Sequence, residues 1–194
     1  MVFQERVYSV LVVSSEQRFS RSLSPLLPET DYYPVHSVSS AAAARRAFLE
    51  RAYDFLIIDT PLPDDFGIKL AAGLCDEKNA VALLFVKSEM YADITSKASE
   101  YGIFTLSRPI SAQTVSYALR WMCATRERLR RLEKKSVSME EKMEEIRLVN
   151  RAKWVLIDRL KMTEADAHRY IEKQAMDRCV TRREIAENII KTYQ

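Results

Sequence analysis

The sequence of 194 residues is poor in residues that build catalytic centres, with three glycines, three cysteines and two histidines. So few glycines leave little room for a glycine-rich phosphate-binding loop, and no nucleophile elbow or metal-ligand set occurs. The cysteines, Cys75, Cys123 and Cys179, lie far apart without a histidine at ligand spacing, which indicates neither a zinc site nor a disulfide framework. We therefore expect a protein that is not an enzyme and that has no metal and no cofactor.

Long hydrophobic runs are missing as well. The segment 1–13 lacks the architecture of a signal peptide, and no apolar run approaches the roughly 20 residues that a membrane-spanning helix needs. The sequence therefore predicts reduced cysteines, a cytoplasmic location and no contact with a membrane.

Charge is distributed unevenly along the chain. Residues 1–119 carry 11 Lys and Arg against 14 Asp and Glu, whereas residues 120–194 carry 19 against 13. The net charge of +3 thus combines an acidic first part with a basic second part. A basic segment predicts an acidic partner, and nucleic acid is the natural candidate.

The first 118 residues alternate apolar runs with helical patterns. Continuous apolar runs, typical of strands buried on both faces, occur at 8–13, 55–58, 81–86 and 103–106, with a weaker one at 34–38. Helical patterns lie between them, at about 17–27, 40–51, 67–77 and 91–101. This alternation predicts an α/β fold for residues 1–118, with a five-stranded, doubly wound, flavodoxin-like parallel sheet.

This part resembles the receiver domain of bacterial response regulators. Asp59 ends the third predicted strand, Pro63 and Gly67 follow at the family's spacing, and Arg108-Pro109 stands where the family has a lysine before proline. A working receiver uses an acidic pair for Mg²⁺, an aspartate that accepts the phosphoryl group, a Thr or Ser, and that lysine. The residues at these positions here are Ser14, Ser15, Asp59, Val86 and Arg108.

These replacements predict a degenerate phosphorylation pocket. Mg²⁺ prefers anionic oxygens, which the hydroxyls of Ser14 and Ser15 do not supply, although Glu16 remains one alternative ligand. We therefore expect a pseudo-receiver in which Asp59 is a structural relic. Its control would come from a regulatory protein or from a ligand bound elsewhere, and not from a kinase.

No proline or glycine occurs after residue 111, and the next segment is predicted to be one long helix. A heptad pattern places Met122, Leu129, Ser136, Met143 and Asn150 at position a. It places Ala118, Thr125, Leu132, Met139 and Ile146 at position d. Residues 119–146 are therefore expected to form the coiled-coil linker of a homodimer, with a solitary helix packed on its own domain as the alternative.

Charges beside this seam favour a parallel pair of helices. The favourable pairs between position g of one copy and position e of the other are Arg128 with Glu133 and Lys135 with Glu140, whereas Lys142 with Arg147 is unfavourable.

Residues 147–194 contain two helix starts. Thr163-Glu-Ala-Asp166 and Thr181-Arg-Arg-Glu184 each place a hydroxyl before a helix and an acid three residues later, as in a capping box. The apolar residues at helical spacing are Val149, Ala152, Leu156, Leu160, Ala167, Tyr170, Ile171, Ala175, Ile185 and Ile189. The pattern predicts three helices with one buried stripe each, with Tyr170 in the core and Trp154 off the stripe.

Several separated pieces of this part match one family in order. Segments 151–157, 163–167, 170–171, 174–176 and 184–186 resemble the ANTAR domain, the RNA-binding module of bacterial transcription antitermination regulators. Trp154 stands where the family usually has a glycine.

The resemblance implies a transcription antiterminator that binds hairpins in nascent leader RNA as a dimer. RNA contacts are expected from Arg151, Lys153, Trp154, Arg159, Lys161, Arg169, Lys173, Arg178, Arg182 and Arg183. Two alternatives stay open, a DNA-binding response regulator and a protein-binding adaptor. The first is disfavoured because no helix-turn-helix signature is visible after residue 119.

Overall fold

The computed structural model describes residues 6–193. They divide into two compact units, one up to Arg130 and one from Arg131 onward. Helix α5 (Ala112–Leu160) contributes its first part to one unit and its second part to the other. Among the described helices, none is both long enough and apolar enough to cross a membrane.

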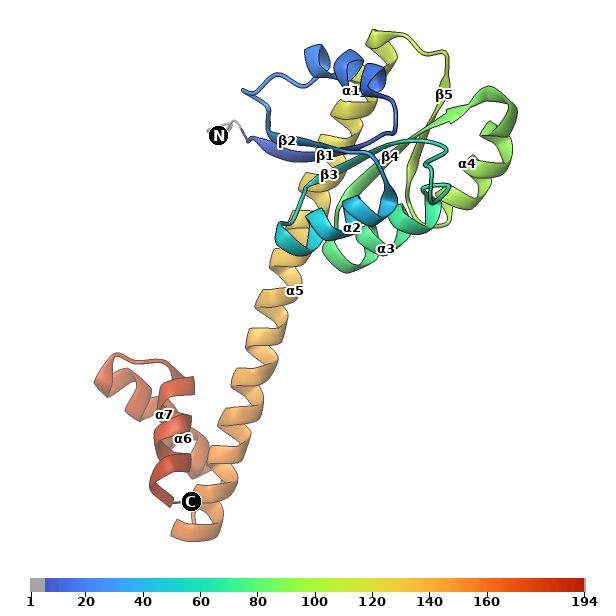
Figure 1. Ribbon diagram of the computed structural model, residues 1–194. Helices are drawn as coiled ribbons and strands as arrows, with labels where there is room; N and C mark the ends of the chain where they lie inside the picture. Colours follow the sequence, from blue (N-terminus) through green and yellow to red (C-terminus); the bar gives the residue numbers. More distant parts are fainter. Residues whose placement is uncertain (1–5, 194) are drawn as a thin grey trace. The chain divides into compact units, whose positions relative to one another are not determined.

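The first unit is an α/β fold with a five-stranded parallel sheet, as predicted (Figure 1). Its strands are β1 (Tyr8–Val13), β2 (Tyr32–Val38), β3 (Phe55–Asp59), β4 (Val81–Lys87) and β5 (Phe104–Arg108), in the spatial order β2-β1-β3-β4-β5. The helices that connect them are α1 (Gln17–Leu23), η1 (Ser24–Leu26), α2 (Ala41–Glu50), α3 (Ile68–Lys78), η2 (Ser88–Met90) and α4 (Tyr91–Ser99).

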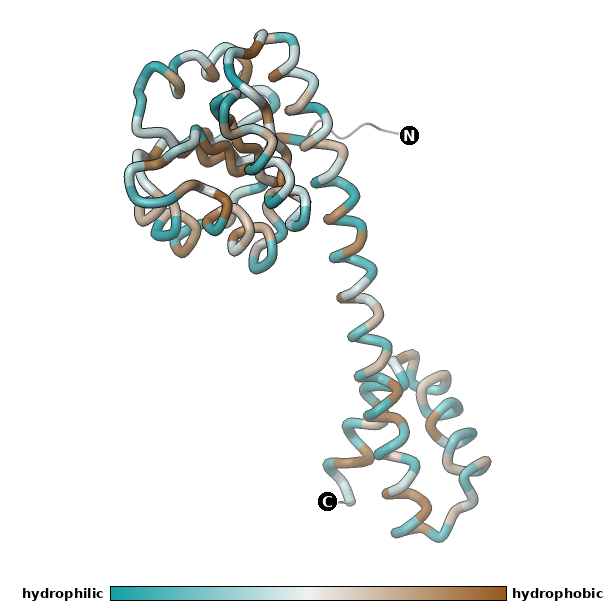
Figure 2. The backbone as a smooth tube through the Cα atoms, turned by 90° about the vertical axis from the view of Figure 1, so that its right-hand side faces the viewer, coloured by the Kyte–Doolittle hydropathy of each residue, from teal (hydrophilic) through white to brown (hydrophobic). Residues whose placement is uncertain are grey.

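Helices cover both faces of this sheet, which explains the unbroken apolar runs in its strands (Figures 1 and 2). Alternate residues of a strand point to opposite faces. Ile58 and Val86 therefore pack with residues of α2, α3 and α4, while Ile57 and Phe85 pack with residues of α1 and of the first part of α5.

The first part of α5 belongs to the core of the first unit, which corrects the predicted heptad seam. Ala118 and Met122 are 1% and 0% exposed and lie in the cluster that covers the sheet, and Leu129 packs against that cluster. These three apolar side chains are therefore unavailable to a second helix. Beyond Arg130, Leu132 is 54% exposed, and the predicted seam is open from that residue on.

The second unit consists of the end of α5, α6 (Glu164–Arg178) and α7 (Arg182–Tyr193), and the three predicted helices are confirmed (Figure 1). The hydroxyl of Thr163 accepts a hydrogen bond from the backbone N–H of Asp166 at 3.2 Å, and that of Thr181 from Glu184 at 3.2 Å. Both helix starts therefore form as the sequence predicts.

The core of this unit contains most of the predicted apolar stripe. Its most deeply buried members are Ala152, Leu156, Ala167, Ile171, Ile185 and Ala186. Leu160 and Tyr170 are 41% and 39% exposed, and their predicted burial is wrong. Leu160 is the last residue of α5, and Lys161 after it adopts a left-handed conformation (φ 55°), so the chain turns away before Leu160 is covered.

Candidate functional site

The buried carboxylate of Asp59 lies at the carboxyl end of β3 and is already paired. The hydroxyl of Ser14 donates a hydrogen bond to Asp59 Oδ2 at 2.8 Å, and Arg108 Nη1 lies 2.5 Å from Oδ1. Arg108 also donates from Nη2 to the carbonyl oxygen of Thr60 at 2.8 Å. Burial raises the pKa of Asp59, against the opposing influence of Ser14 and Arg108. Both carboxylate oxygens of Asp59 therefore face protein groups.

The other carboxylates in the loop after β3 are engaged with the backbone. Asp64 accepts hydrogen bonds from the free N–H groups of Ala41 and Ala42 at the start of α2, at 2.9 and 3.0 Å. These bonds hold the pKa of Asp64 below its usual value. Asp65 accepts from the N–H of Gly67 at 2.6 Å. Both acids thus cap backbone N–H groups, and in residues 6–193 no cluster of three His, Cys, Asp or Glu could hold a metal ion.

The position predicted for the phosphate-binding Thr or Ser requires a correction. Asp59 is in register with Phe85, so the neighbouring residue Val86 points to the opposite face of the sheet. Val86 is fully buried there, in the core formed with α2, α3 and α4. The next residue on the Asp59 side is Lys87, which is exposed and in register with Arg108. A register error of one residue is sufficient to place a strand residue on the wrong face.

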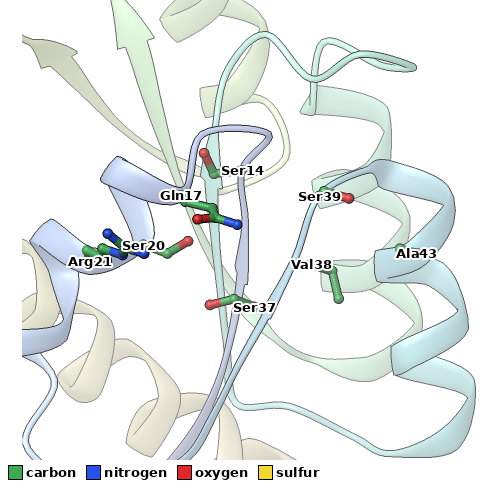
Figure 3. Close-up of a pocket in the computed structure, with 8 residues that line it drawn as sticks. All are labelled: Ser14, Gln17, Ser20, Arg21, Ser37, Val38, Ser39 and Ala43. Atoms are coloured by element: carbon green, nitrogen blue, oxygen red, sulfur yellow. The ribbon is translucent and has the colours of Figure 1, made fainter.

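An open depression lies beside Ser14 (Figure 3). Its lining residues are Ser14, Gln17, Ser20, Arg21, Ser37, Val38, Ser39 and Ala43. They supply hydroxyl, amide and guanidinium groups but no carboxylate. Ser15 and Glu16 next to it are exposed. The depression therefore offers polar contacts without the anionic oxygens that Mg²⁺ prefers.

At the opposite end of β3, Asp54 holds helix α5 through a network that sequence reasoning missed. Asp54 accepts hydrogen bonds from the N–H and the hydroxyl of Ser9 at 3.1 and 3.2 Å. It also accepts from Arg126 Nε at 2.9 Å and Arg130 Nη2 at 2.6 Å. We call these four residues the Asp54 clamp. Burial alone would raise the pKa of Asp54, but the two arginines and Ser9 together hold it below its usual value.

Further contacts surround the Asp54 clamp. Arg130 Nη1 donates to Glu127 at 2.9 Å, and the guanidinium of Arg130 lies 5.4 Å from the centre of the Tyr8 ring. Glu127 also pairs with Arg6. The acid and the arginines stand more than 70 positions apart, and only the spacing of Arg126 and Arg130, one helical turn, is visible in the sequence.

The predicted RNA-binding residues of the second unit fall into two groups. Five of the predicted basic side chains form no ion pair with a described residue: Arg151, Lys161, Arg169, Lys173 and Arg178. Four others lie near acids: Lys153 at 3.1 Å from Glu164, Arg159 at 3.9 Å from Asp158, Arg182 at 3.2 Å from Glu145, and Arg183 at 3.0 Å from Glu187.

Among the expected RNA contacts, Lys153 has the least exposed of the paired side chains. Its side chain is only 16% exposed because α6 begins beside it and Glu164 pairs with its ammonium group. Lys153, one of the expected RNA contacts, therefore lies in a covered position and is already paired with an acid.

Helix α6 presents unpaired cations on its outer face. Arg169, Lys173 and Met176 follow one another at spacings of four and three residues, which places them on one side of the helix, opposite the buried Ile171. Met176 is 78% exposed, and Tyr170, next to Arg169 in the chain, is also exposed. The positive charge on the outer face of α6 is thus flanked by an accessible aromatic ring at the edge of the helix. On α5, Trp154 is 70% exposed.

Comparison with known proteins assigns a class to each unit. Residues 138–190 match the ANTAR domain family. The first unit is similar to a signal receiver domain of an HD domain-containing protein from Pseudomonas fluorescens Pf-5, with 24% identity, 68% of this chain and 96% of that chain covered, and a TM-score of 0.59. It is also similar to a CheY-like response regulator receiver domain from Methylobacillus flagellatus, with 26% identity, 60% and 99% coverage, and a TM-score of 0.52.

The chain thus combines a receiver-like fold with a segment that matches the ANTAR domain family. Over most of its length it is similar to the transcriptional regulatory protein PdtaR of Mycobacterium tuberculosis, in strains CDC 1551 / Oshkosh and ATCC 25618 / H37Rv. Each relative is 26% identical over 184 residues, which cover 94% of this chain and 89% of the relative.

Proposed function

We propose that this protein is an RNA-binding transcription antitermination regulator that binds hairpins in nascent leader RNA as a homodimer. The observation that carries the proposal is the coincidence of the ANTAR match with unpaired cations on α6, where Arg169, Lys173 and Arg178 form no ion pair within the described residues. An unpaired cation can neutralise a phosphate without first breaking a contact with an acid.

The exposed Tyr170 is the residue that we expect to contact RNA bases and so to distinguish loop sequences. Bases in single-stranded loops are unstacked and can stack on an aromatic side chain, at about 1–3 kcal/mol per base. Tyr170 is exposed beside Arg169, so one base could stack on its ring while neighbouring phosphates contact the cations.

The second copy is expected to pack along the second part of α5. Leu132, Met139, Met143 and Ile146 are each more than half exposed, although the rest of this segment is highly charged. Burying this seam against a second helix would remove apolar surface from water. A Leu132→Glu, Met139→Glu double variant should therefore sediment as a monomer, and a wild type that is monomeric at high micromolar concentration would contradict the homodimer.

The receiver unit is proposed to act without a cofactor and without a phosphoryl group. Asp59 is held by Ser14 and Arg108, and the nearby acids Asp64 and Asp65 are bonded to backbone N–H groups. A regulatory protein that binds this unit would supply the signal.

The RNA interface can be tested with an RNA that carries two adjacent small hairpins, by fluorescence anisotropy at several salt concentrations. Arg169→Ala combined with Lys173→Ala should weaken binding at least tenfold. If two phosphate contacts are lost, the slope of log affinity against log salt should become shallower by about 1.4. Arg183→Ala is the matched control because Arg183 pairs with Glu187, and it should have a much smaller effect.

The same measurement separates the alternatives. Unchanged RNA affinity in the double variant would move the RNA site away from α6. Equal affinity for a DNA duplex would favour a DNA-binding regulator, and failure to bind either nucleic acid would favour a protein-binding adaptor. Tyr170→Ala should reduce discrimination between loop sequences, whereas Tyr170→Phe keeps the ring and should retain it.

A further inference from the structure

Trp154 is the most exposed aromatic side chain of the second unit, and the buried face of α5 does not explain it. Its 70% exposure contrasts with Ala152 and Leu156, two residues to either side, which are 0% and 1% exposed. A single exposed apolar ring is ordinary on a protein surface, but one that continues a larger apolar patch marks an interaction surface.

Trp154 lies in line with the exposed seam of α5. At about 100° per residue, Leu132, Met139, Met143, Ile146 and Trp154 all fall within an arc of about 80° around the helix. The spacing continues from Ile146 to Asn150 and then to Trp154 in two steps of four residues. A second step of four residues, where the heptad would have three, is called a stutter. A straight α-helix has 3.6 residues per turn and not 3.5, so an apolar stripe stays on one face only if such steps occur periodically.

The d position that follows Ile146 is occupied by a side chain that is already paired. Strict heptad spacing would place Lys153 in the seam, but its ammonium group pairs with Glu164 at the start of α6. With the stutter, the seam position falls on Trp154 instead of Lys153, and the side chain of Trp154 is exposed. Asn150, one turn earlier, is exposed at position a, and an Asn at this position is a common device for setting the register of two helices.

Continuity with the seam favours a helix of a second copy over RNA as the partner of this ring. Asp158, one turn further along α5, is 76% exposed and would repel phosphates on that side of the ring, although Arg151, one turn earlier, has no ion pair among the described residues. Of the charges that flank the seam in a parallel pair, Lys135 of one copy faces Glu140 of the other favourably, whereas Lys142 faces Arg147 unfavourably.

We propose that Trp154 is part of the interface between two copies of this chain, so that the helix pairing continues into the ANTAR domain. This inference rests on the proposed homodimer. It reassigns Trp154 from RNA contact to dimer contact and leaves base stacking to Tyr170 on α6.

Fluorescence of a single tryptophan tests the proposal directly. The chain contains two tryptophans, and Trp121→Phe leaves Trp154 as the only one, with little structural cost because Trp121 is 56% exposed. The full chain without RNA is diluted from high micromolar to nanomolar concentration, and its oligomeric state is followed by sedimentation. The emission maximum of Trp154 should move to longer wavelength as the dimer dissociates.

Two variants sharpen the measurement. Trp154→Ala should weaken self-association at least tenfold, and Trp154→Phe should largely restore it. Because the ring lies outside the core of its own unit, neither change should alter far-ultraviolet circular dichroism.

Other outcomes would overturn the proposal. Emission that stays constant while sedimentation records dissociation would place Trp154 outside an existing interface, and the homodimer would still stand. Emission that responds only to hairpin RNA, added to protein already dimeric, would return Trp154 to the RNA site. A chain that never dimerises would refute the homodimer and this proposal together.

Discussion

The two units use their charged side chains in different ways. In the first unit, Arg126 and Arg130 pair with Asp54, and Arg108 pairs with Asp59. In the second unit, Arg169 and Lys173 form no ion pair within the described residues. A cation held by a carboxylate contributes to structure, whereas an unpaired one is available to a partner. Pairing therefore separates individual cations with a structural role, such as Arg126 and Arg108, from cations that are available to a partner, such as Arg169.

The first unit also treats the two ends of strand β3 differently. Asp54, just before the strand, accepts from two arginines and Ser9, and its pKa is lowered. Asp59, at the end of the strand, has a raised pKa because burial outweighs its contacts with Ser14 and Arg108. The structure thus stabilises the ionised form of Asp54 and penalises that of Asp59.

The largest effect is expected from removing the acid of the Asp54 clamp. Asp54→Ala leaves two arginines without their acid, and breaking a fully buried pair in this way costs about 3–5 kcal/mol. Arg130 can turn toward solvent because its side chain is 24% exposed, so we expect a loss of about 2–3 kcal/mol. Urea unfolding followed by Trp121 fluorescence, in a Trp154→Phe background, measures it. Asp76→Ala, at an exposed acid, is the control, and an equal loss there would contradict the comparison.

The stability that the Asp54 clamp contributes should depend on pH. Because the folded-state pKa of Asp54 is depressed, its contribution is fully present above the unfolded value of about 3.9 and is lost as pH falls through the folded pKa. The difference in unfolding free energy between the wild type and Asp54→Asn should therefore be constant from about pH 6 to 8 and shrink below about pH 4. A difference that shrinks near neutral pH would mean that another group titrates.

Asp59 is expected to contribute little to stability and nothing to phosphoryl transfer. Asp59→Asn removes a charge that burial penalises, so the unfolding free energy should change by less than about 1 kcal/mol. Incubation of the wild type with acetyl phosphate and Mg²⁺ should give no adduct by intact mass. A stoichiometric phosphoryl adduct that is absent in Asp59→Asn would show a working receiver and would end the contrast between the two ends of β3.

The smallest effect on stability is expected at the unpaired cations. Arg169→Ala and Lys173→Ala remove no ion pair of the described residues and no core contact, so the unfolding free energy should stay within about 0.5 kcal/mol of the wild type. The same thermal or urea curves used for Asp54 provide the measurement. A loss comparable to that of Asp54→Ala would mean that these side chains are structural after all.

Much of the fold could be predicted from local sequence alone. The runs at 8–13 and 81–86 became β1 and β4, and Thr163 and Thr181 begin helices as their capping residues predict. These features depend on residues within a few positions of each other, and apolar periodicity or a cap is strong enough to specify them. The resemblances to a receiver and to an ANTAR domain rested on such local patterns as well.

Tertiary structure decided which side chains are covered and which are paired. Met122 and Tyr170 both fit an apolar stripe, but only Met122 is buried, because the sheet lies against the first part of α5, whereas the described residues leave Tyr170 at the edge of α6 39% exposed. Lys153 and Arg169 both fit the polar face of a helix in the sequence, yet Lys153 pairs with Glu164, and Arg169 pairs with no acid among the described residues. Helical periodicity identifies a face but not its neighbour, and ion pairs between distant residues form only when packing brings them together. For this reason the sequence determined the elements and their class, and only the folded chain decided which cations and which rings remain open to a partner.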